Sequence, residues 1–221
     1  MPVSGKQLAH MMDGTLIRTD STRAETLELA RYAKKYGFYS VIGVGVFYPL
    51  LVEEMKGSGI LVGSGCGGIM MTSALKAEFA RQNLALGCAE CDMVMNLPAF
   101  KSGLYDEVVK DIRTVKDAMG SHVLKCIIET PLLSDDEIRK ACELVMEGGA
   151  DFVKTAVGRD GPVTVHHIEV ISDTVKGRIK VKASGGIRTL DAVDRMIDLG
   201  VSRFGVSYKS GAALVEAADR R

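Results

Sequence analysis

A complete strand–helix–strand unit is formed by VLKCIIE at residues 123–129, DDEIRKACELVME at 135–147 and FVKT at 152–155. Ser134 and Glu137 stand at the spacing of a capping box, which marks the start of the helix. In both outer runs the apolar residues are consecutive and do not alternate with polar ones. Such strands are typical of a parallel sheet that is covered by helices on both faces. The unit therefore predicts an α/β fold with parallel strands.

The same alternation extends in both directions along the chain. Apolar runs expected to be strands lie at residues 9–16, 39–44, 60–63, 91–95, 123–129, 152–155, 179–182 and 203–207. Stretches expected to be helices lie at residues 23–35, 49–56, 72–86, 105–119, 135–147, 165–175, 190–199 and 212–219. Eight units of about 28 residues predict one domain, a single (β/α)8 barrel over residues 1–221. An open doubly wound sheet is the alternative, but the first turn, DGTL at 13–16, lacks the Gly-x-Gly-x-x-Gly fingerprint.

Composition excludes several classes of function. The 28 basic and 28 acidic residues cancel, so the chain has no overall positive charge for binding nucleic acid or an anionic membrane. No run approaches the ~18 apolar residues of a membrane span, and the first residues lack the apolar core of a signal peptide. The five cysteines are an odd number, and the four histidines have no metal-ligand spacing. We therefore expect buried thiols in a reduced cytoplasm and no metal site.

Ionisable side chains cluster where a barrel carries its chemistry, near the C-terminal ends of the strands. They are Asp13, Asp92, Lys125, Glu129, Lys154 and Lys182. Lys154 and Lys182 fall on neighbouring strands, and two buried ammonium groups side by side lower the pKa of a lysine. A lysine that is neutral in part can attack a carbonyl carbon and form a Schiff base. The alternative is that one of the two lysines reaches the rim of the barrel or pairs with Asp92.

The turns after the last strands predict a phosphate site. Loops after the seventh and eighth strands of such barrels commonly bind phosphate through backbone N–H groups and a helix N-terminus. Two adjacent glycines let the backbone come close to an anion. The residues expected around the anion and the substrate are Thr155, Gly158, Arg159, Gly185, Gly186, Ile187, Arg188, Gly205 and Ser207.

Four segments, taken in order, resemble the deoxyribose-phosphate aldolases. ECDMVMN at 90–96, followed by KSG, resembles the fourth strand of that family, and IIETPLL at 127–133 resembles the fifth. DFVKT at 151–155 is similar to its Schiff-base strand, and VKASGGIRT at 181–189 to its seventh strand and phosphate turn. The resemblance covers nearly the whole chain. It implies a class I aldolase that cleaves 2-deoxy-D-ribose 5-phosphate to acetaldehyde and D-glyceraldehyde 3-phosphate, with no metal or organic cofactor.

The resemblance also implies a role for each ionisable side chain. Lys154 is expected to be the Schiff-base nucleophile. Lys182 is expected to be the second lysine, which lowers the pKa of Lys154 and takes part in proton transfer. Asp92 is expected to act with a water molecule as the proton shuttle at the carbon acid. Asp13 and Lys125 match positions that support this relay and the substrate hydroxyls.

The loops at residues 42–45, 65–74 and 156–157, together with Tyr208, depart from the family's pattern. They leave two alternatives open: a Schiff-base aldolase of the same fold with another hydroxy-aldehyde or keto substrate, and a non-catalytic barrel that binds a phosphorylated sugar. Asp92, Lys154 and Lys182 together argue against the non-catalytic barrel, because unpaired buried charges are costly. The expected partner is a phosphorylated sugar or aldehyde, not nucleic acid or a membrane. A homo-oligomer, dimer or tetramer, is compatible with this function.

Overall fold

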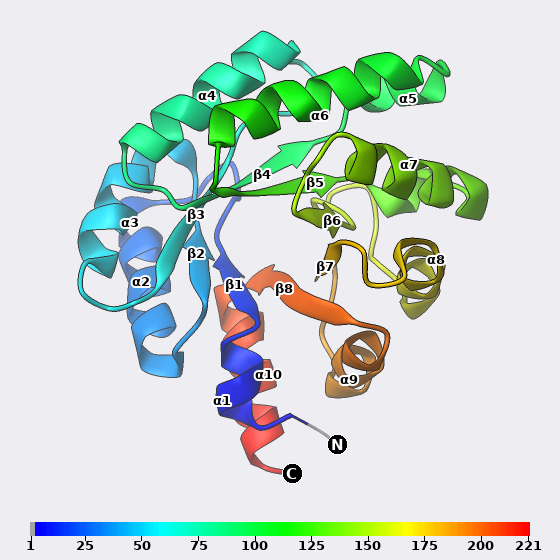
Figure 1. Ribbon diagram of the computed structural model, residues 1–221. Coiled ribbons are helices and arrows are strands. Elements are labelled where there is room, and N and C mark those ends of the chain that lie inside the picture. Colours follow the sequence, from blue (N-terminus) through cyan, green and yellow to red (C-terminus); the bar gives the residue numbers. More distant parts are fainter. Residues whose placement is uncertain (1–2) are drawn as a thin grey trace.

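The computed structural model describes residues 3–221, which form a closed barrel of eight parallel strands (Figure 1). The strands are β1 (Met12–Thr15), β2 (Ser40–Ile42), β3 (Leu61–Gly65), β4 (Glu90–Val94), β5 (Val123–Ile127), β6 (Phe152–Lys154), β7 (Lys180–Ser184) and β8 (Val201–Ser207). Each strand pairs with the next, and β8 pairs with β1. This closure confirms the predicted (β/α)8 architecture and rules out the open doubly wound sheet.

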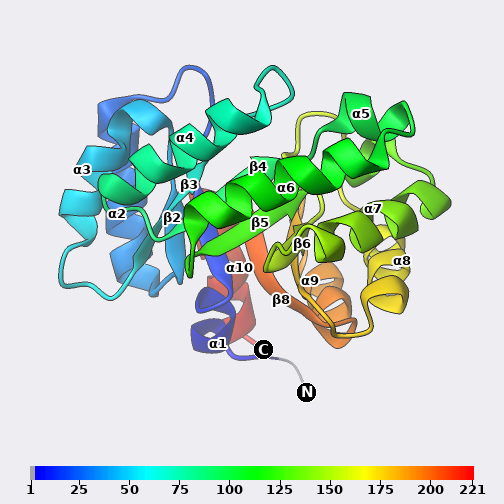
Figure 2. The same cartoon turned by 45° about the horizontal axis from the view of Figure 1, so that its top comes forward.

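Helices surround the barrel (Figures 1 and 2). They are α1 (Gly5–Ala9), α2 (Arg23–Tyr36), α3 (Tyr48–Met55), α4 (Ser73–Ala85), α5 (Leu97–Lys101), α6 (Tyr105–Met119), α7 (Asp135–Glu147), α8 (Val165–Val175), α9 (Leu190–Asp198) and α10 (Tyr208–Asp219). Helices α6, α7 and α8 have the predicted bounds, and Ser134 begins α7 with the predicted capping box. None of the helices within residues 3–221 is long and apolar enough to cross a membrane.

Two short helices, α1 and α5, were not predicted. Helix α1 occupies the start of the first expected strand, so β1 begins at Met12 instead of residue 9. Ser4 and Gln7 form a capping box that satisfies two free N–H groups at the start of α1. Helix α5 is capped by Asn96, and its first turn contains Pro98. Proline has no backbone N–H, and the first turn of a helix does not use one.

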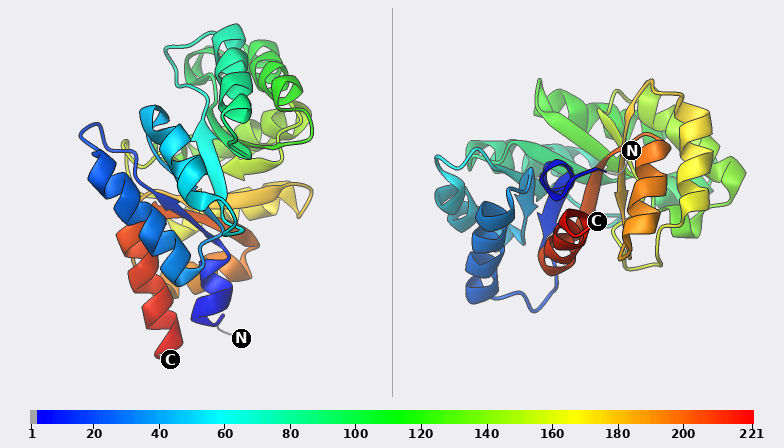
Figure 3. Two further views of the ribbon diagram at one scale, coloured as in Figure 1. Left: turned by 90° about the vertical axis from the view of Figure 1, so that its left-hand side faces the viewer. Right: turned by 90° about the horizontal axis from the view of Figure 1, so that it is seen from below.

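Helix α10 also differs from the prediction, because it begins at Tyr208 instead of residue 212. The Ser207 side chain caps it by accepting the N–H of Ser210 at 3.2 Å. The N-terminus of α10 therefore follows β8 without a loop, at the C-terminal end of the barrel. At its other end α10 lies beside α1 (Figure 3), where the Gly5 N–H donates to Asp219 at 2.8 Å.

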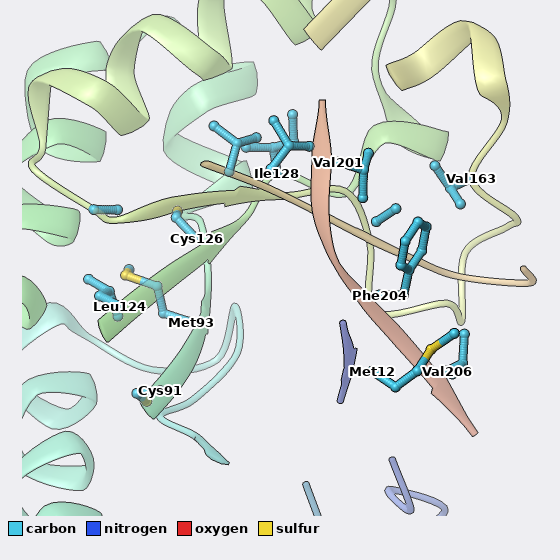
Figure 4. Close-up of a cluster of buried hydrophobic side chains, with 14 of the residues drawn as sticks. Met12, Cys91, Met93, Leu124, Cys126, Ile128, Val163, Val201, Phe204 and Val206 are labelled. Atoms are coloured by element: carbon cyan, nitrogen blue, oxygen red, sulfur yellow. The ribbon is translucent and has the colours of Figure 1, made fainter. Parts of the chain in front are cut away.

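An apolar core fills the layer between the strands and the helices. In Figure 4, Met93, Leu124 and Phe204 belong to this layer, and all three side chains are fully buried. They alternate along the strands with residues that face the barrel interior. The five cysteines are free and buried, and burial raises the pKa of Cys88 to about 12. The prediction of buried thiols is confirmed.

Strands β7 and β8 are longer than predicted, and the register of their pairing shifts once. The register shifts between Val181 and Lys182, and Lys182 lies opposite Arg203. Ser202 is therefore one extra residue in β8, which is the definition of a β-bulge. Beyond the bulge, Arg203 and Gly205 face the interior of the barrel beside the inward side chains of β7.

Candidate active site

Seven charged side chains from six strands meet inside the barrel. This interior cluster consists of Asp13, Glu90, Asp92, Lys125, Lys154, Lys182 and Arg203. Every member is buried, and Glu90 and Asp92 share the inner face of β4 because residues two apart in a strand point the same way. Four cations face three carboxylates, so the cluster carries one excess positive charge when all its members are ionised.

Lys154, Lys182 and Asp92 form the part of the cluster nearest the C-terminal ends of the strands. The two lysines lie opposite each other on β6 and β7. Lys154 Nζ lies 2.8 Å and Lys182 Nζ 2.9 Å from the same atom, Oδ2 of Asp92. Lys182 also lies 2.6 Å from Oδ2 of Asp13. The alternative in which a lysine pairs with Asp92 is therefore correct for both lysines, and their repulsion acts across a shared carboxylate.

The remaining cations of the cluster, Lys125 and Arg203, pair most closely with Glu90 and Asp13. Lys125 Nζ lies 2.6 Å from Oε2 of Glu90. Arg203 Nη1 lies 2.8 Å from Oδ1 of Asp13 and 3.4 Å from Oε2 of Glu90. The guanidinium of Arg203 also stacks over the Tyr39 ring, 3.4 Å from its centroid. These pairs hold the part of the cluster that lies farther from the C-terminal ends of the strands. Lys154 is left with the shared Asp92 as its only carboxylate partner within residues 3–221.

The lysines differ in the pKa of their ammonium groups. Burial lowers the pKa of Lys154 below its ordinary value; Asp92 opposes this shift, and the Lys182 cation adds to it. Burial also acts to lower the pKa of Lys125, but the neighbouring carboxylates outweigh it and raise that pKa. Burial alone would raise the pKa of Asp92, yet the three ammonium groups around it hold it well below its usual range. Lys154 therefore loses its proton more easily than Lys125.

Access also distinguishes Lys154 from its neighbours. Lys154 is 8% exposed, whereas Lys125 and Lys182 are 0% exposed. Lys154 is the last residue of β6, so its amine is next to the open end of the barrel. A substrate carbonyl that enters from that end meets Lys154 before the other two lysines.

A cavity of about 360 Å³ opens at the same end of the barrel. Its walls include seven of the residues predicted around the anion: Gly158, Gly185, Gly186, Ile187, Arg188, Gly205 and Ser207. The N-terminus of α10 also lines it, as do the residues Arg18 and Lys209. Free N–H groups at a helix N-terminus and nearby cations favour an anion. The cavity therefore suits a phosphate group.

Glycines bring the walls of this cavity close together. A Cβ atom at Gly158 would lie 3.2 Å from the Cα of Gly185, and Gly185 has a φ of 108°, which residues with a side chain rarely adopt. A Cβ atom at Gly205 would lie 3.0 Å from Cε of Lys182. Gly205 is thus the point at which the cavity and the interior cluster touch.

Residues 65–214 match the model of the DeoC/LacD family aldolases. The deoxyribose-phosphate aldolase of Staphylococcus carnosus is 42% identical over 202 residues, which cover 90% of this chain and 92% of that protein. The chain belongs to the DeoC/LacD aldolase family. The deoxyribose-phosphate aldolase of Mycoplasmopsis pulmonis is 38% identical over 214 residues, which cover 95% of this aldolase and 96% of that one.

Solved structures agree with this assignment. The aldolase QR15 superposes on this DeoC/LacD aldolase with a TM-score of 0.90 at 33% identity, over 97% of this chain and 96% of that one. The deoxyribose phosphate aldolase of Aeropyrum pernix, which is described as a tetramer, has a TM-score of 0.84 at 28% identity, over 97% and 92% of the two chains.

Two predicted residues of the aldolase lie away from the cavity walls. The Thr155 hydroxyl donates to the carbonyl of Ser184 at 2.8 Å and accepts its N–H at 2.9 Å, so it ties β6 to β7. Arg159 is exposed and does not line the cavity. Tyr208 lines the cavity, and its hydroxyl donates to Glu28 on α2 at 2.7 Å.

Sequence reasoning missed Glu90 and Arg203. A signal for both was present, because each precedes a predicted site residue by two positions on the same strand and so shares its face. It also missed Arg18 and Lys209 on the cavity wall. Neither of these has a local pattern that separates it from an ordinary exposed cation.

Proposed function

We propose that this chain is a class I aldolase that cleaves 2-deoxy-D-ribose 5-phosphate to acetaldehyde and D-glyceraldehyde 3-phosphate. The observation that carries the proposal is the position of Lys154: it is buried with a lowered pKa, yet it is the most accessible lysine of the interior cluster. The anion-suited cavity at the same end of the barrel supports a phosphorylated substrate. The names of the relatives in the family support the choice of sugar.

The first step forms an imine on Lys154. The neutral amine attacks the C1 aldehyde carbon of the open-chain sugar, and the resulting carbinolamine loses water to give an iminium ion. The reaction starts from an interior cluster in which three cations balance three carboxylates, because Lys154 has given up its proton. Asp92 then stays paired with Lys182 at 2.9 Å while Lys154 reacts.

The second step breaks the bond between C2 and C3. A base removes the proton of the C3 hydroxyl, the C2–C3 electron pair moves toward the iminium nitrogen, and D-glyceraldehyde 3-phosphate leaves. The remaining enamine takes a proton at C2, and water hydrolyses the imine to release acetaldehyde and the free amine. We assign the proton transfers to Asp92 acting through a water molecule, with Lys182 as the proton-holding cation beside it.

We assign the other interior residues to support of this reaction. Asp13 holds Lys182 at 2.6 Å and Arg203 at 2.8 Å, and Lys125 lies 3.4 Å from Oδ1 of Asp92. Asp13 and Lys125 therefore orient Lys182 and Asp92, the two residues to which we assign the proton transfers. The phosphate is held by the cavity walls at Gly185–Arg188, Gly158, Gly205 and Ser207. The amine and the carboxylates of the chain are sufficient for every step, so no metal or organic cofactor enters the proposal.

Reductive trapping tests the assignment of Lys154. Incubation with acetaldehyde and borohydride should add one ethyl group to the chain, and peptide mapping should place it on Lys154. Lys154→Ala should take up no label while keeping its fold, as judged by circular dichroism. A label on Lys182 or Lys125 of the wild-type chain would overturn the assignment.

We further propose that the chain functions in the cytoplasm as one barrel domain within a homo-oligomer. The five free, buried thiols suit a reducing compartment. The tetramer described for the Aeropyrum pernix relative makes a dimer or a tetramer the expected assembly. Light scattering of the purified chain measures the mass of the assembly directly.

A further inference from the structure

We propose that Glu129 is a positioning residue that fixes the wall of the anion cavity formed by the loop after β6. The inference rests on the proposed function of that cavity. Glu129 follows the C-terminal end of β5 and is buried. Both of its carboxylate oxygens accept the backbone N–H of Val157, Oε2 at 3.0 Å and Oε1 at 3.2 Å. Val157 and the next residue, Gly158, line the cavity.

The carboxylate of Glu129 lacks the partner that a buried charge usually has. Within residues 3–221, no Lys, Arg or His nitrogen forms an ion pair with it. Burial raises the pKa of Glu129 and Asp160 adds to this shift, whereas the Val157 N–H and, without an ion pair, the more distant Lys154 cation oppose it. A buried acid without a cation is costly in a fold. Its presence at this position therefore needs an explanation that the interior cluster does not supply.

The backbone of Glu129 is also unusual. Its φ of 56° and ψ of 60° place it in the left-handed region, which is unfavourable for a residue with a long side chain. Backbone hydrogen bonds on either side hold it there: the Ile128 N–H donates to the Lys154 carbonyl at 3.0 Å, and the Thr130 N–H donates to the Thr155 carbonyl at 2.9 Å. Strained backbone that is held in this way often orients functional groups. Here it turns the Glu129 side chain toward the loop after β6.

The consequence for the cavity is geometric. The bond to Val157 sets the position of Gly158, and a Cβ atom at Gly158 would lie only 3.2 Å from the Cα of Gly185. A small movement of this loop thus changes the distance between two walls of the cavity. A negative charge near the cavity by itself disfavours an anion. Glu129 must therefore help an anion through the position of the loop and not through its charge.

Two substitutions separate geometry from charge. Glu129→Gln keeps an oxygen acceptor for the Val157 N–H and removes the charge, whereas Glu129→Ala removes both. The experiment measures the Kd of inorganic phosphate by calorimetry, and kcat and KM for 2-deoxyribose 5-phosphate and for unphosphorylated 2-deoxyribose. For Glu129→Ala we expect the phosphate Kd and the KM of the phosphorylated sugar to rise ~10-fold, the effect of losing one hydrogen bond to a charged group. For Glu129→Gln we expect both to stay within about twofold of wild type.

The unphosphorylated sugar separates this role from a general defect. Its kcat/KM should change by no more than about twofold in Glu129→Ala, because the cavity wall does not contact it. An equal loss for both sugars would overturn the inference, since it would place the effect at Lys154 or in the fold. A phosphate Kd that is unchanged in Glu129→Ala would also overturn it. If wild type fails to bind phosphate, the proposed anion cavity and this inference fall together.

A third variant keeps the test decisive if Glu129→Ala does not fold. Glu129→Asp retains the charge but withdraws the acceptor from Val157 by one methylene. The geometric role predicts weaker phosphate binding for Glu129→Asp and nearly normal binding for Glu129→Gln. The reverse order would show that the charge matters and would overturn the inference.

Discussion

The ammonium groups of Lys154 and Lys182 lie on one oxygen atom, Oδ2 of Asp92, at 2.8 and 2.9 Å. A single carboxylate oxygen thus stabilises two cations that repel each other. Removal of a proton from Lys154 relieves that repulsion and leaves the Asp92–Lys182 pair intact. This arrangement makes the protonation state of Lys154 sensitive to each of its two neighbours, with opposite signs.

The pH dependence of kcat/KM tests this electrostatic arrangement. Lys154 must be neutral to attack, so the acid limb of the profile follows its pKa. Lys182→Met removes a cation that lowers this pKa. The pKa of Lys154 should therefore rise, the acid limb should move to higher pH, and the rate should fall ~10²-fold or more through loss of proton transfer.

Asp92→Asn should move the same limb the other way. The carboxylate raises the pKa of Lys154, so its removal lowers that pKa, and the acid limb should move to lower pH. Lys180→Met is the matched control, because Lys180 is also on β7 but is exposed. Its profile should match that of wild type. Shifts of the same sign in the Lys182 and Asp92 variants would contradict the model.

The cavity predicts a strong preference for a phosphorylated substrate. Binding energy from the remote phosphate orients the carbonyl at Lys154, so its loss should lower kcat as well as raise KM. We expect kcat/KM for 2-deoxyribose 5-phosphate to exceed that for 2-deoxyribose by ~10²-fold, the effect of a few charge-assisted hydrogen bonds. Inorganic phosphate should inhibit competitively. Equal rates without inhibition would instead favour a Schiff-base aldolase for another hydroxy-aldehyde.

Gly205→Ala should impair catalysis from outside the interior cluster. The new Cβ would lie 2.8 Å from Cβ of Ser184 and 3.0 Å from Cε of Lys182, so one of these groups must move. We expect a loss of about 1–3 kcal/mol in the free energy of unfolding and a clear fall in kcat. Gly68→Ala is the control, because a Cβ there meets no atom within 4 Å. Urea unfolding and steady-state kinetics measure both effects.

A buried ion pair between α4 and α6 should matter for stability and not for chemistry. Lys76 Nζ lies 2.6 Å from Oδ2 of Asp111 and donates to the Val94 carbonyl at 2.9 Å. Figure 2 shows the two helices side by side. Asp111→Ala leaves the buried Lys76 ammonium without its partner and should cost ~3–5 kcal/mol of unfolding free energy. Adding Lys76→Met should recover part of this loss in urea unfolding. The kcat of the folded fraction should stay normal in both variants.

Much of the barrel and its central lysines is predictable from the sequence. Apolar strands that alternate with capped helices specify a parallel barrel, and Lys154 and Lys182 stand out because a buried lysine is rare. The prediction placed both on adjacent strands, and the structure does the same. The sequence also placed Asp92 on the fourth strand, but it could not show that one oxygen of this carboxylate reaches both amines from two strands away. That convergence depends on the closure of the barrel.

The missed features have local causes. Residues 9–11 are compatible with a strand, and only the cap at Ser4 shows that α1 competes for this segment. Arg159 was predicted at the anion from its position after β6, but three successive exposed residues there, 158–160, carry its side chain to the surface. Glu129 was among the ionisable residues predicted at the strand ends, but it received no role, because the sequence does not reveal a left-handed backbone at a residue other than glycine.

The extra residue in β8 makes this barrel unequally tolerant of insertions and deletions. Deletion of Ser202 would leave Val201 opposite Val181 and Arg203 opposite Lys182, so every inward side chain of β8 would keep its place. Deletion of Phe204, two residues later, would instead move each following residue by one position and put Val206 in place of Gly205 beside Ser184. A branched side chain would then fill the narrow junction between the cavity and Lys182. In an alignment of relatives, a one-residue gap at Ser202 is therefore compatible with the same active site, whereas a gap at Phe204 would signal a different one.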